Sequence, residues 1–161
     1  MMRAFKISAL ALGLFVAACA GTSLATVATD ADNLATGLAA AAKDMRAANV
    51  LSAAQLVQVD NALSAVQAAS GALASAATKS AQQTQVEQLA GGVNAMVAAL
   101  SAVPTLPAPV PEIMAAASVM LPVLESAVGI VTPVAVAASG MTPAQADAIL
   151  AANAAEFRAG G

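Results

Sequence analysis

The chain contains no histidine, tyrosine or tryptophan, and only 9% of its 161 residues are charged. Without histidine it has no imidazole general base, no Ser-His-Asp or Cys-His pair and no imidazole metal ligand. Six basic residues and a formal net charge of −3 argue against a basic patch for nucleic acid. A single cysteine allows neither an intramolecular disulfide nor a thiolate metal cluster. The composition therefore predicts no catalytic, cofactor or metal site.

Hydrophobic residues, in contrast, make up 60% of the chain, and 48 residues, about 30%, are alanine. Alanine has the highest intrinsic helix propensity, and this length is enough for one compact domain. We therefore expect an all-α fold: an antiparallel bundle of four to five helices with heptad-like, alanine-rich seams, following an N-terminal signal helix.

The N-terminus is typical of a secretory signal peptide. Arg3 and Lys6 form a short basic region, and an apolar run of about twelve residues extends from Ile7 to Ala18. This run has the length of a signal core and is too short to span a bilayer comfortably. Residues 1–18 are therefore predicted to be an export signal.

The signal ends in Val16-Ala17-Ala18-Cys19, which resembles the lipobox of bacterial lipoproteins: an aliphatic residue, two small residues and cysteine. Cys19 is the only cysteine, and its thiol is the group that could take a lipid as a thioether. The alternative is an ordinary signal peptide followed by a chance cysteine. The resemblance implies a mature chain that starts at Cys19 with acyl chains on its sulfur and amine. It also implies outer-membrane placement, because Ala20 stands where an aspartate would signal retention at the inner membrane.

Cleavage after residue 18 would leave four basic against nine acidic residues, a net charge of about −5 (4 − 9). Such a chain is not expected to bind anionic headgroups by charge. Residues 19–29 are predicted to be a tether, and 30–103 a region of three alanine-rich helices. Short loops between these helices favour antiparallel neighbours.

Apolar residues recur at steps of three and four through 30–103, the spacing of one helix face. The three stripes are Leu34, Leu38, Ala41, Met45 and Ala48; Leu56, Val59, Leu63, Val66, Ser70, Leu73 and Ala77; and Val86, Leu89, Val93, Met96, Leu100 and Val103. Thr29, Asp30 and Asp32 are candidate caps of the first helix, and Ser52 and Gln55 form a capping box for the second. Packing of the stripes within one chain or between copies stays open.

Four prolines in 104–111 predict a stiff, extended connector. The next segment, 112–138, is predicted to be an apolar helix with a proline kink. Within 113–137 there is one charged residue, Glu125, and the summed insertion free energy is near zero. Two interpretations stay open: a buried bundle helix whose edge at Glu125 reaches water, and a membrane-inserted helix.

The remaining segment, 139–161, is predicted to be a short helix and a tail. Thr142 and Gln145 form a second capping box, and Pro143 occupies the first helical position. Ala146, Ile149, Leu150 and Phe157 give this helix a modest apolar face.

The polar groups do not form a concentrated set for acid–base catalysis. The acidic residues lack the spacing of a calcium loop and are predicted to be caps and solvated faces: Asp30, Asp32, Asp44 and Asp60. Glu125 would carry a proton or ion only if its helix were inserted in a membrane. No predicted strand precedes Gly91-Gly92, which excludes a phosphate loop. The glycine pair predicts either a close helix contact or a kink.

The layout resembles small alanine-rich bacterial lipoproteins, among them the family of the major outer-membrane lipoprotein, whose heptad helices form a trimeric coiled coil. This chain is longer, is interrupted at 104–111, and ends in Gly161 without the terminal lysine that links that family to peptidoglycan. Its closing part, from Leu121 to Ala146, resembles uncharacterised alanine-rich proteins of alphaproteobacterial and prophage origin, which implies no activity.

Together these features predict an exported, lipid-anchored envelope protein with a structural or interaction role and no catalysis. Its expected partners are the membrane, through the lipid anchor, and a second copy or another envelope protein. Nucleic acid and a small-molecule substrate are not expected. The alternatives are a membrane-active protein, such as a phage-type lysis or pore accessory, that inserts 113–137, and a periplasmic carrier of an apolar ligand.

Overall fold

The computed structural model describes residues 23–130 and 140–160. In these ranges it contains five α-helices and no strand. They are α1 (Leu24–Ala47), α2 (Ala53–Ser75), α3 (Lys79–Leu100), α4 (Val110–Ala127) and α5 (Pro143–Ala159). The all-α fold class predicted from the composition is confirmed.

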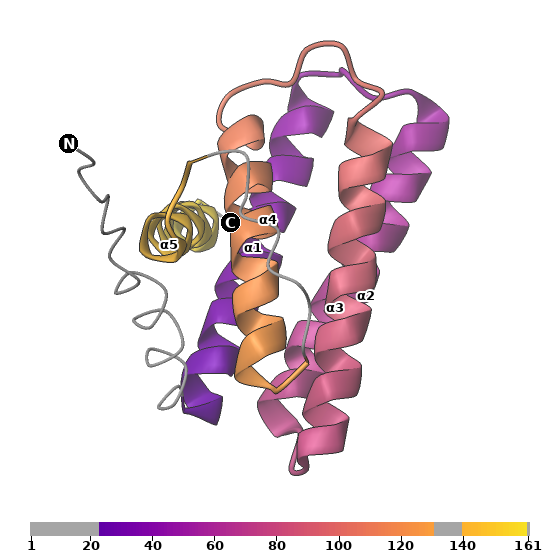
Figure 1. Cartoon of the computed structure of the whole chain (residues 1–161). Helices are drawn as coiled ribbons and strands as arrows, with labels where there is room; N and C mark the ends of the chain where they lie inside the picture. Colours follow the sequence, from indigo (N-terminus) through magenta and orange to yellow (C-terminus); the bar gives the residue numbers. More distant parts are fainter. Residues whose placement is uncertain (1–22, 131–139, 161) are drawn as a thin grey trace, which may run out of the picture.

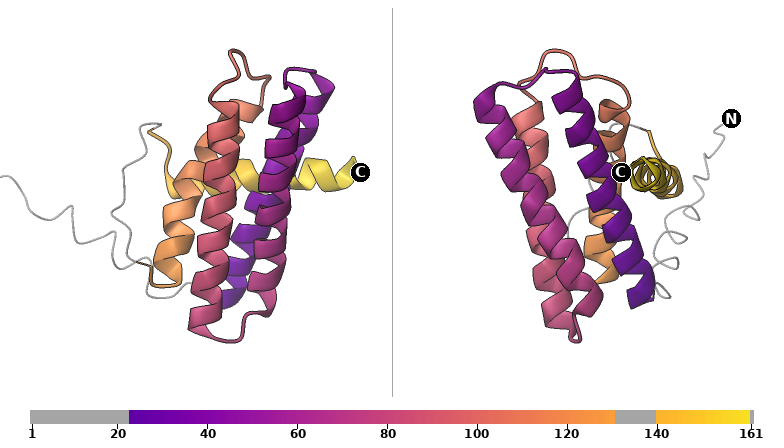
Figure 2. Two further views of the ribbon diagram at one scale, coloured as in Figure 1. Left: turned by 90° about the vertical axis from the view of Figure 1, so that its right-hand side faces the viewer. Right: turned by 180° about the vertical axis from the view of Figure 1, so that it is seen from behind.

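Helices α1 to α4 form an antiparallel bundle in which each helix packs against the next and α4 closes the ring on α1 (Figure 1). Helix α5 does not extend this bundle. It runs across the outside of α1 and α4, as the side view in Figure 2 shows. The fold is therefore a closed four-helix bundle with a fifth helix laid crosswise on one side.

The core is built from the apolar stripes, and they pack within the single chain. All six members of the α3 stripe, from Val86 to Val103, are buried. At the ends of the other two stripes, Ala48 and Ala77 are exposed. Around the larger side chains, alanines such as Ala31, Ala42 and Ala117 are fully buried. These small residues allow the helices to approach closely.

Both predicted capping boxes are present. The Ser52 hydroxyl accepts a hydrogen bond from the Gln55 backbone N–H at 3.3 Å, and the Gln55 side-chain oxygen accepts one from the Ser52 N–H at 2.9 Å. Thr142 and Gln145 repeat the arrangement at 3.3 and 2.9 Å. Each box satisfies N–H groups that a helix start leaves unpaired.

The first helix begins one and a half turns earlier than expected, so residues 24–29 are helical rather than part of the tether. Its N-cap is Ser23, whose hydroxyl accepts a hydrogen bond from the Thr26 N–H at 3.2 Å. Thr29, a predicted cap, instead donates to the Ala25 carbonyl at 2.9 Å. The early start is favoured because Val27 is buried and extends the apolar side of the helix by one turn.

Helix α4 continues through Pro122 but ends at Ala127, so the prediction of a helix to residue 138 is wrong at its C-terminal end. Gly129 adopts φ +80°, a left-handed conformation that glycine accepts without steric cost. The Ile130 N–H donates to the Glu125 carbonyl at 2.8 Å, and the Gly129 N–H donates to the Ser126 carbonyl at 3.0 Å. This pair of bonds is a Schellman motif, which terminates a helix. Residues 131–138 lie outside the described residues.

Candidate functional site

Cys19, the predicted lipid acceptor, lies outside the described residues, as does the whole of 1–18. The first described residue, Ser23, lies four residues after Cys19 and caps α1. Four residues of chain span at most about 14 Å. A lipid on Cys19 would therefore hold the N-terminal end of α1 close to the bilayer.

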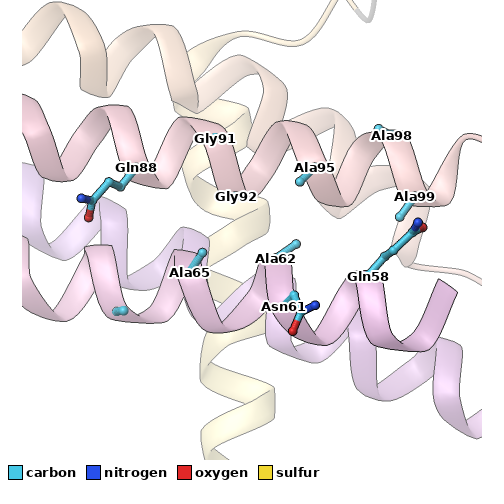
Figure 3. Close-up of a pocket in the computed structure, with 11 residues that line it drawn as sticks. Gln58, Asn61, Ala62, Ala65, Gln88, Gly91, Gly92, Ala95, Ala98 and Ala99 are labelled. Carbon is cyan, nitrogen blue, oxygen red and sulfur yellow. The ribbon is translucent and has the colours of Figure 1, made fainter. Parts of the chain in front are cut away.

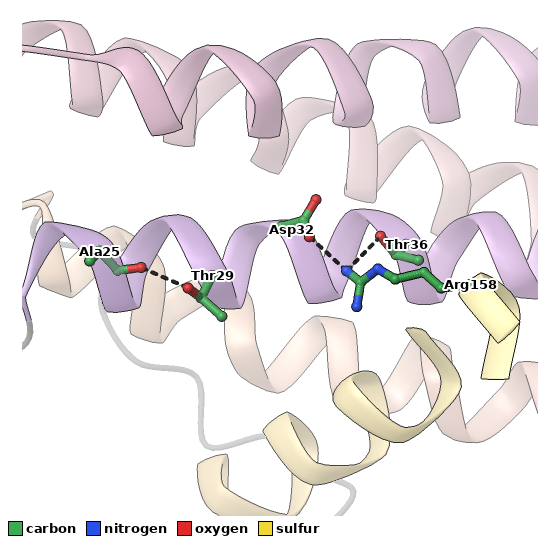
Figure 4. A network of polar contacts seen from close by, with 5 residues as sticks. All are labelled: Ala25, Thr29, Asp32, Thr36 and Arg158. Carbon is green, nitrogen blue, oxygen red and sulfur yellow. Dashed lines mark hydrogen bonds and ion pairs between the residues drawn. The ribbon is translucent and has the colours of Figure 1, made fainter. Parts of the chain in front are cut away.

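Polar contacts between distant parts of the chain join α1 to α5. Arg158 donates from Nη2 to the Asp32 carboxylate at 2.6 Å and to the Thr36 hydroxyl at 3.3 Å (Figure 4). The Lys43 ammonium lies 5.3 Å from the centre of the Phe157 ring, a cation–π contact. The predicted solvated carboxylate of Asp32 is thus part of the contact that holds α5 in place.

The ion pairs on the surface are exposed and individually weak. The side chains of Arg158 and Asp32 are 48% and 62% exposed, and those of Arg46 and Asp60, which join α1 to α2, are 44% and 52% exposed. Pairs at such exposure contribute about 0.2–1 kcal/mol each. They position helices relative to one another and form no catalytic group.

Asp30 is an acidic residue whose pKa clearly departs from its ordinary value. It lies half-buried on α1. Burial, and secondarily the negative charge of Asp147 on α5, raise the pKa of its carboxyl group. Asp30 is therefore not the helix cap predicted from the sequence, but a carboxylate whose ionised form is disfavoured at the α1–α5 contact.

Replacement of Asp30 by asparagine is expected to stabilise the protein at neutral pH. Because the folded state raises the pKa of Asp30, the wild type loses stability as the pH rises from the ordinary carboxyl pKa through the raised one. The Asp30→Asn variant has no such loss. Its free energy of unfolding should therefore exceed that of the wild type above the raised pKa and equal it below the ordinary carboxyl pKa. Urea unfolding at a series of pH values measures the effect. Asp147→Asn should reproduce part of it, and an unchanged pH profile in both variants would contradict the assignment.

Among the described residues, no three histidine, cysteine or acidic side chains are grouped so that they could hold a metal ion. Lys43, Asp44 and Arg46 share the C-terminal part of α1. Two of them contact different helices: Lys43 lies over Phe157 of α5, and Arg46 pairs with Asp60 of α2.

Glu125 lies half-buried on the side of α4 that also carries Ser118 and Gly129, both exposed. The opposite side of the helix is buried: Ile113, Ala117, Met120, Leu124 and Val128. This division agrees with the interpretation of a bundle helix with one edge reaching water. By length and composition α4 is also long and apolar enough to cross a membrane, a property it shares with core helices of soluble proteins.

Of the paired glycines, Gly92 makes the close helix contact and Gly91 does not. A Cβ on Gly92 would lie 2.6 Å from Val66 Cγ2 and 3.1 Å from the Ala62 carbonyl oxygen, both on α2. A Cβ on Gly91 would meet nothing within 4 Å. Gly92 therefore sets the spacing of α2 and α3, while Gly91 lies on their exposed side.

An open groove of about 810 Å³ follows the outer seam between α2 and α3 (Figure 3). Its lining is uncharged and consists of small residues with three amides: Gln58, Asn61, Ala62, Ala65, Ala68, Gln88, Gly91, Gly92, Ala95, Ala98 and Ala99. It holds no group that could act as an acid, a base or a nucleophile. The groove is a feature of the surface, outside the bundle core where an apolar ligand was considered.

The sequence signals did not identify the α1–α5 contact, since Asp32 and Arg158 are 126 residues apart and neither belongs to a motif. Searches of protein-family models, curated proteins and solved structures found no match for this chain.

Proposed function

We propose that this chain is an exported lipoprotein of the bacterial cell envelope, anchored through Cys19, with a structural or interaction role and no catalysis. The observation that carries the proposal is the Val16-Ala17-Ala18-Cys19 sequence at the end of an export signal, with the chain's only cysteine at its last position. Two or more acyl chains give stable membrane anchoring, whereas a single chain gives only marginal binding. Ala20 favours the outer membrane, with the bundle in the periplasm.

The described bundle suits this role because it is a small helical body that begins directly after the anchor. The short distance from Cys19 to Ser23 would place one end of the bundle at the membrane surface. That end contains the N-termini of α1 and α3 and the C-termini of α2 and α4 (Figure 1). The α1–α2 and α3–α4 connections would then face away from the bilayer and be accessible to another envelope protein.

A second candidate function is membrane insertion of α4, as in a lysis or pore accessory protein. The observation in its favour is the length and apolar composition of Val110–Ala127, with a mean hydropathy of 1.3 over 18 residues. Insertion would require α4 to exchange its contacts with α1, α3 and α5 for lipid. It would also bring Glu125, two residues from the C-terminal end of α4, to the edge of the hydrocarbon region, where a charged side chain is less favourable than in water.

Mass spectrometry of the protein produced from the full-length gene in a Gram-negative host tests the proposal. We expect a chain that begins at Cys19 and carries a thioether-linked diacylglycerol and an amide-linked acyl chain. Growth with an inhibitor of the lipoprotein signal peptidase should leave residues 1–18 attached. An unmodified chain that begins at residue 19, or cleavage that the inhibitor does not affect, would contradict the proposal and identify an ordinary signal peptide.

A further inference from the structure

Helix α5 is attached to the bundle by a small apolar contact. It buries three residues, Ala146, Leu150 and Ala154, of which only Leu150 has a large side chain. Ile149 and Phe157 are partly buried against the core. Helix α4, with 18 residues against the 17 of α5, buries nine residues. Because burial of apolar area is the main stabilising contribution to helix docking, the side chains of α5 themselves contribute less to its docking than those of a bundle helix do.

The main apolar contact of α5 lies over a glycine of α1. A Cβ on Gly37 would be 3.1 Å from Leu150 Cδ2, 3.7 Å from the Leu150 carbonyl oxygen and 3.8 Å from Ile113 Cγ2. Leu150 thus rests directly on the α1 backbone beside Ile113 of α4. Without α5, this part of the α1–α4 surface would be uncovered and apolar.

The four-helix ring does not depend on α5 for its closure. The contacts α1–α2, α2–α3, α3–α4 and α1–α4 complete it, and in the described ranges α5 packs only on α1 and α4 (Figure 2). The start of α5 is likewise satisfied by its own residues, through the box of Thr142 and Gln145. Both the bundle and α5 therefore keep their internal hydrogen bonds if they separate.

Charged residues attract α5 to α1 at one end of the contact and repel it at the other. Arg158 with Asp32, and Lys43 with Phe157, hold the C-terminal half of α5. Near its N-terminal half, Asp147 repels Asp30. The other charged residues of the three helices are Asp44 and Arg46 on α1, Glu112 and Glu125 on α4, and Glu156 on α5. Acidic groups outnumber basic ones across this contact, so charge gives α5 little net attraction at neutral pH.

We infer that α5 is a detachable cover, which opens as a unit from an intact four-helix bundle and uncovers the apolar α1–α4 surface around Gly37 and Ile113. Segments with few buried apolar contacts open locally at lower free energy than the whole domain unfolds. This opening of α5 is expected whether or not Cys19 is lipidated.

Hydrogen exchange of the purified protein, followed by mass spectrometry, tests this inference. After correction for intrinsic rates, backbone amides of α5 should exchange at least about 100-fold faster than those of the buried parts of α2 and α3. The amides of α1 and α4 should follow α2 and α3. A common rate for all five helices would overturn the inference, because α5 would then open only when the whole domain unfolds.

A matched pair of variants adds a second readout. Gly37→Met places a long side chain under Leu150, whereas Gly71→Met places it where nothing lies within 4 Å. We expect Gly37→Met to speed exchange in α5 by roughly tenfold or more and to increase binding of an apolar dye, with α2 and α3 unaffected. Gly71→Met should leave α5 unchanged. Equal acceleration of all five helices in Gly37→Met would show that α5 is an integral part of the core.

Discussion

The Cys19→Ser variant, exported behind an ordinary signal that is cleaved before residue 19, is expected in the soluble periplasmic fraction. The natural chain is expected in the outer membrane. The difference arises because acyl chains are the only proposed anchor. A single myristoyl-sized chain binds bilayers with a constant of about 10⁴ M⁻¹, and two or more chains make binding stable. Removal of all of them should shift nearly the whole population. Fractionation followed by immunodetection measures the change.

A second cysteine position provides the matched control. The double variant Cys19→Ser, Thr22→Cys, behind the natural signal, keeps one thiol. The thiol then lies three residues further from Ala17-Ala18 than in the natural chain. This chain should carry no lipid, since the serine at position 19 would stand where the lipobox has an aliphatic residue, although Ala20 and Gly21 still supply two small residues before the thiol. Lipidation at position 22 would contradict the assignment of Cys19 as a specific acceptor.

Membrane retention of the soluble-signal variant would have a different meaning. Without acyl chains, α4 is the described helix whose length and composition allow insertion. Retention that resists carbonate extraction would therefore replace the anchored-bundle proposal with the membrane-active one. Full recovery in the soluble fraction would indicate that the bundle accommodates α4.

Gly92→Ala is expected to destabilise the bundle, whereas Gly91→Ala, one residue away, is expected to stabilise it. Alanine in place of an exposed helical glycine gains about 0.5–1 kcal/mol from intrinsic propensity. At position 92 the same gain is opposed by overlap with Val66 Cγ2 at 2.6 Å and close approach to its backbone nitrogen at 3.2 Å. Overpacking of this kind costs about 1–3 kcal/mol. Thermal unfolding should separate the variants by several degrees, at roughly 2–4 °C per kcal/mol.

The partner residue provides a specific check of the cause. Val66 is β-branched and has little rotamer freedom in a helix, so it cannot turn away from a methyl group on residue 92. Val66→Ala removes the contacting methyl and should make the cost of Gly92→Ala smaller in the double variant than in the single one. Strict additivity of the two changes would mean that the clash is relieved elsewhere, for example by movement of α3 as a whole.

Much of the fold was predictable because its signals are local. The stripe from Val86 to Val103 marks a helix face by spacing alone. The boxes at Ser52 and Thr142 fix two helix starts through bonds that span three residues. The start of α1 differs from the prediction because Thr29 and Asp30 are residue types that commonly cap helices. The burial of Val27, which favours a helix start at Ser23, depends on contacts with other helices.

The end of α4 shows a similar limit. The residues after Ala127 are as apolar as those before it, so hydropathy favoured one long helix. The helix instead ends at Ala127. Gly129, two residues later, lies close to the Lys79 side chain, and the Gln83 amide donates to the Val128 carbonyl at 3.2 Å. Residues of α3 thus complete a helix end 45 positions later in the chain.

The sequence by itself determined the helical class and the internal faces of the helices, because each depends on residues within a few positions of one another. Only the tertiary structure decided that the stripes pack within one chain, that Gly92 rather than Gly91 sets the helix spacing, and that α5 lies across α1 and α4. These depend on contacts between residues far apart in the chain. Alanine-rich faces are similar enough that periodicity alone does not select which pairs meet.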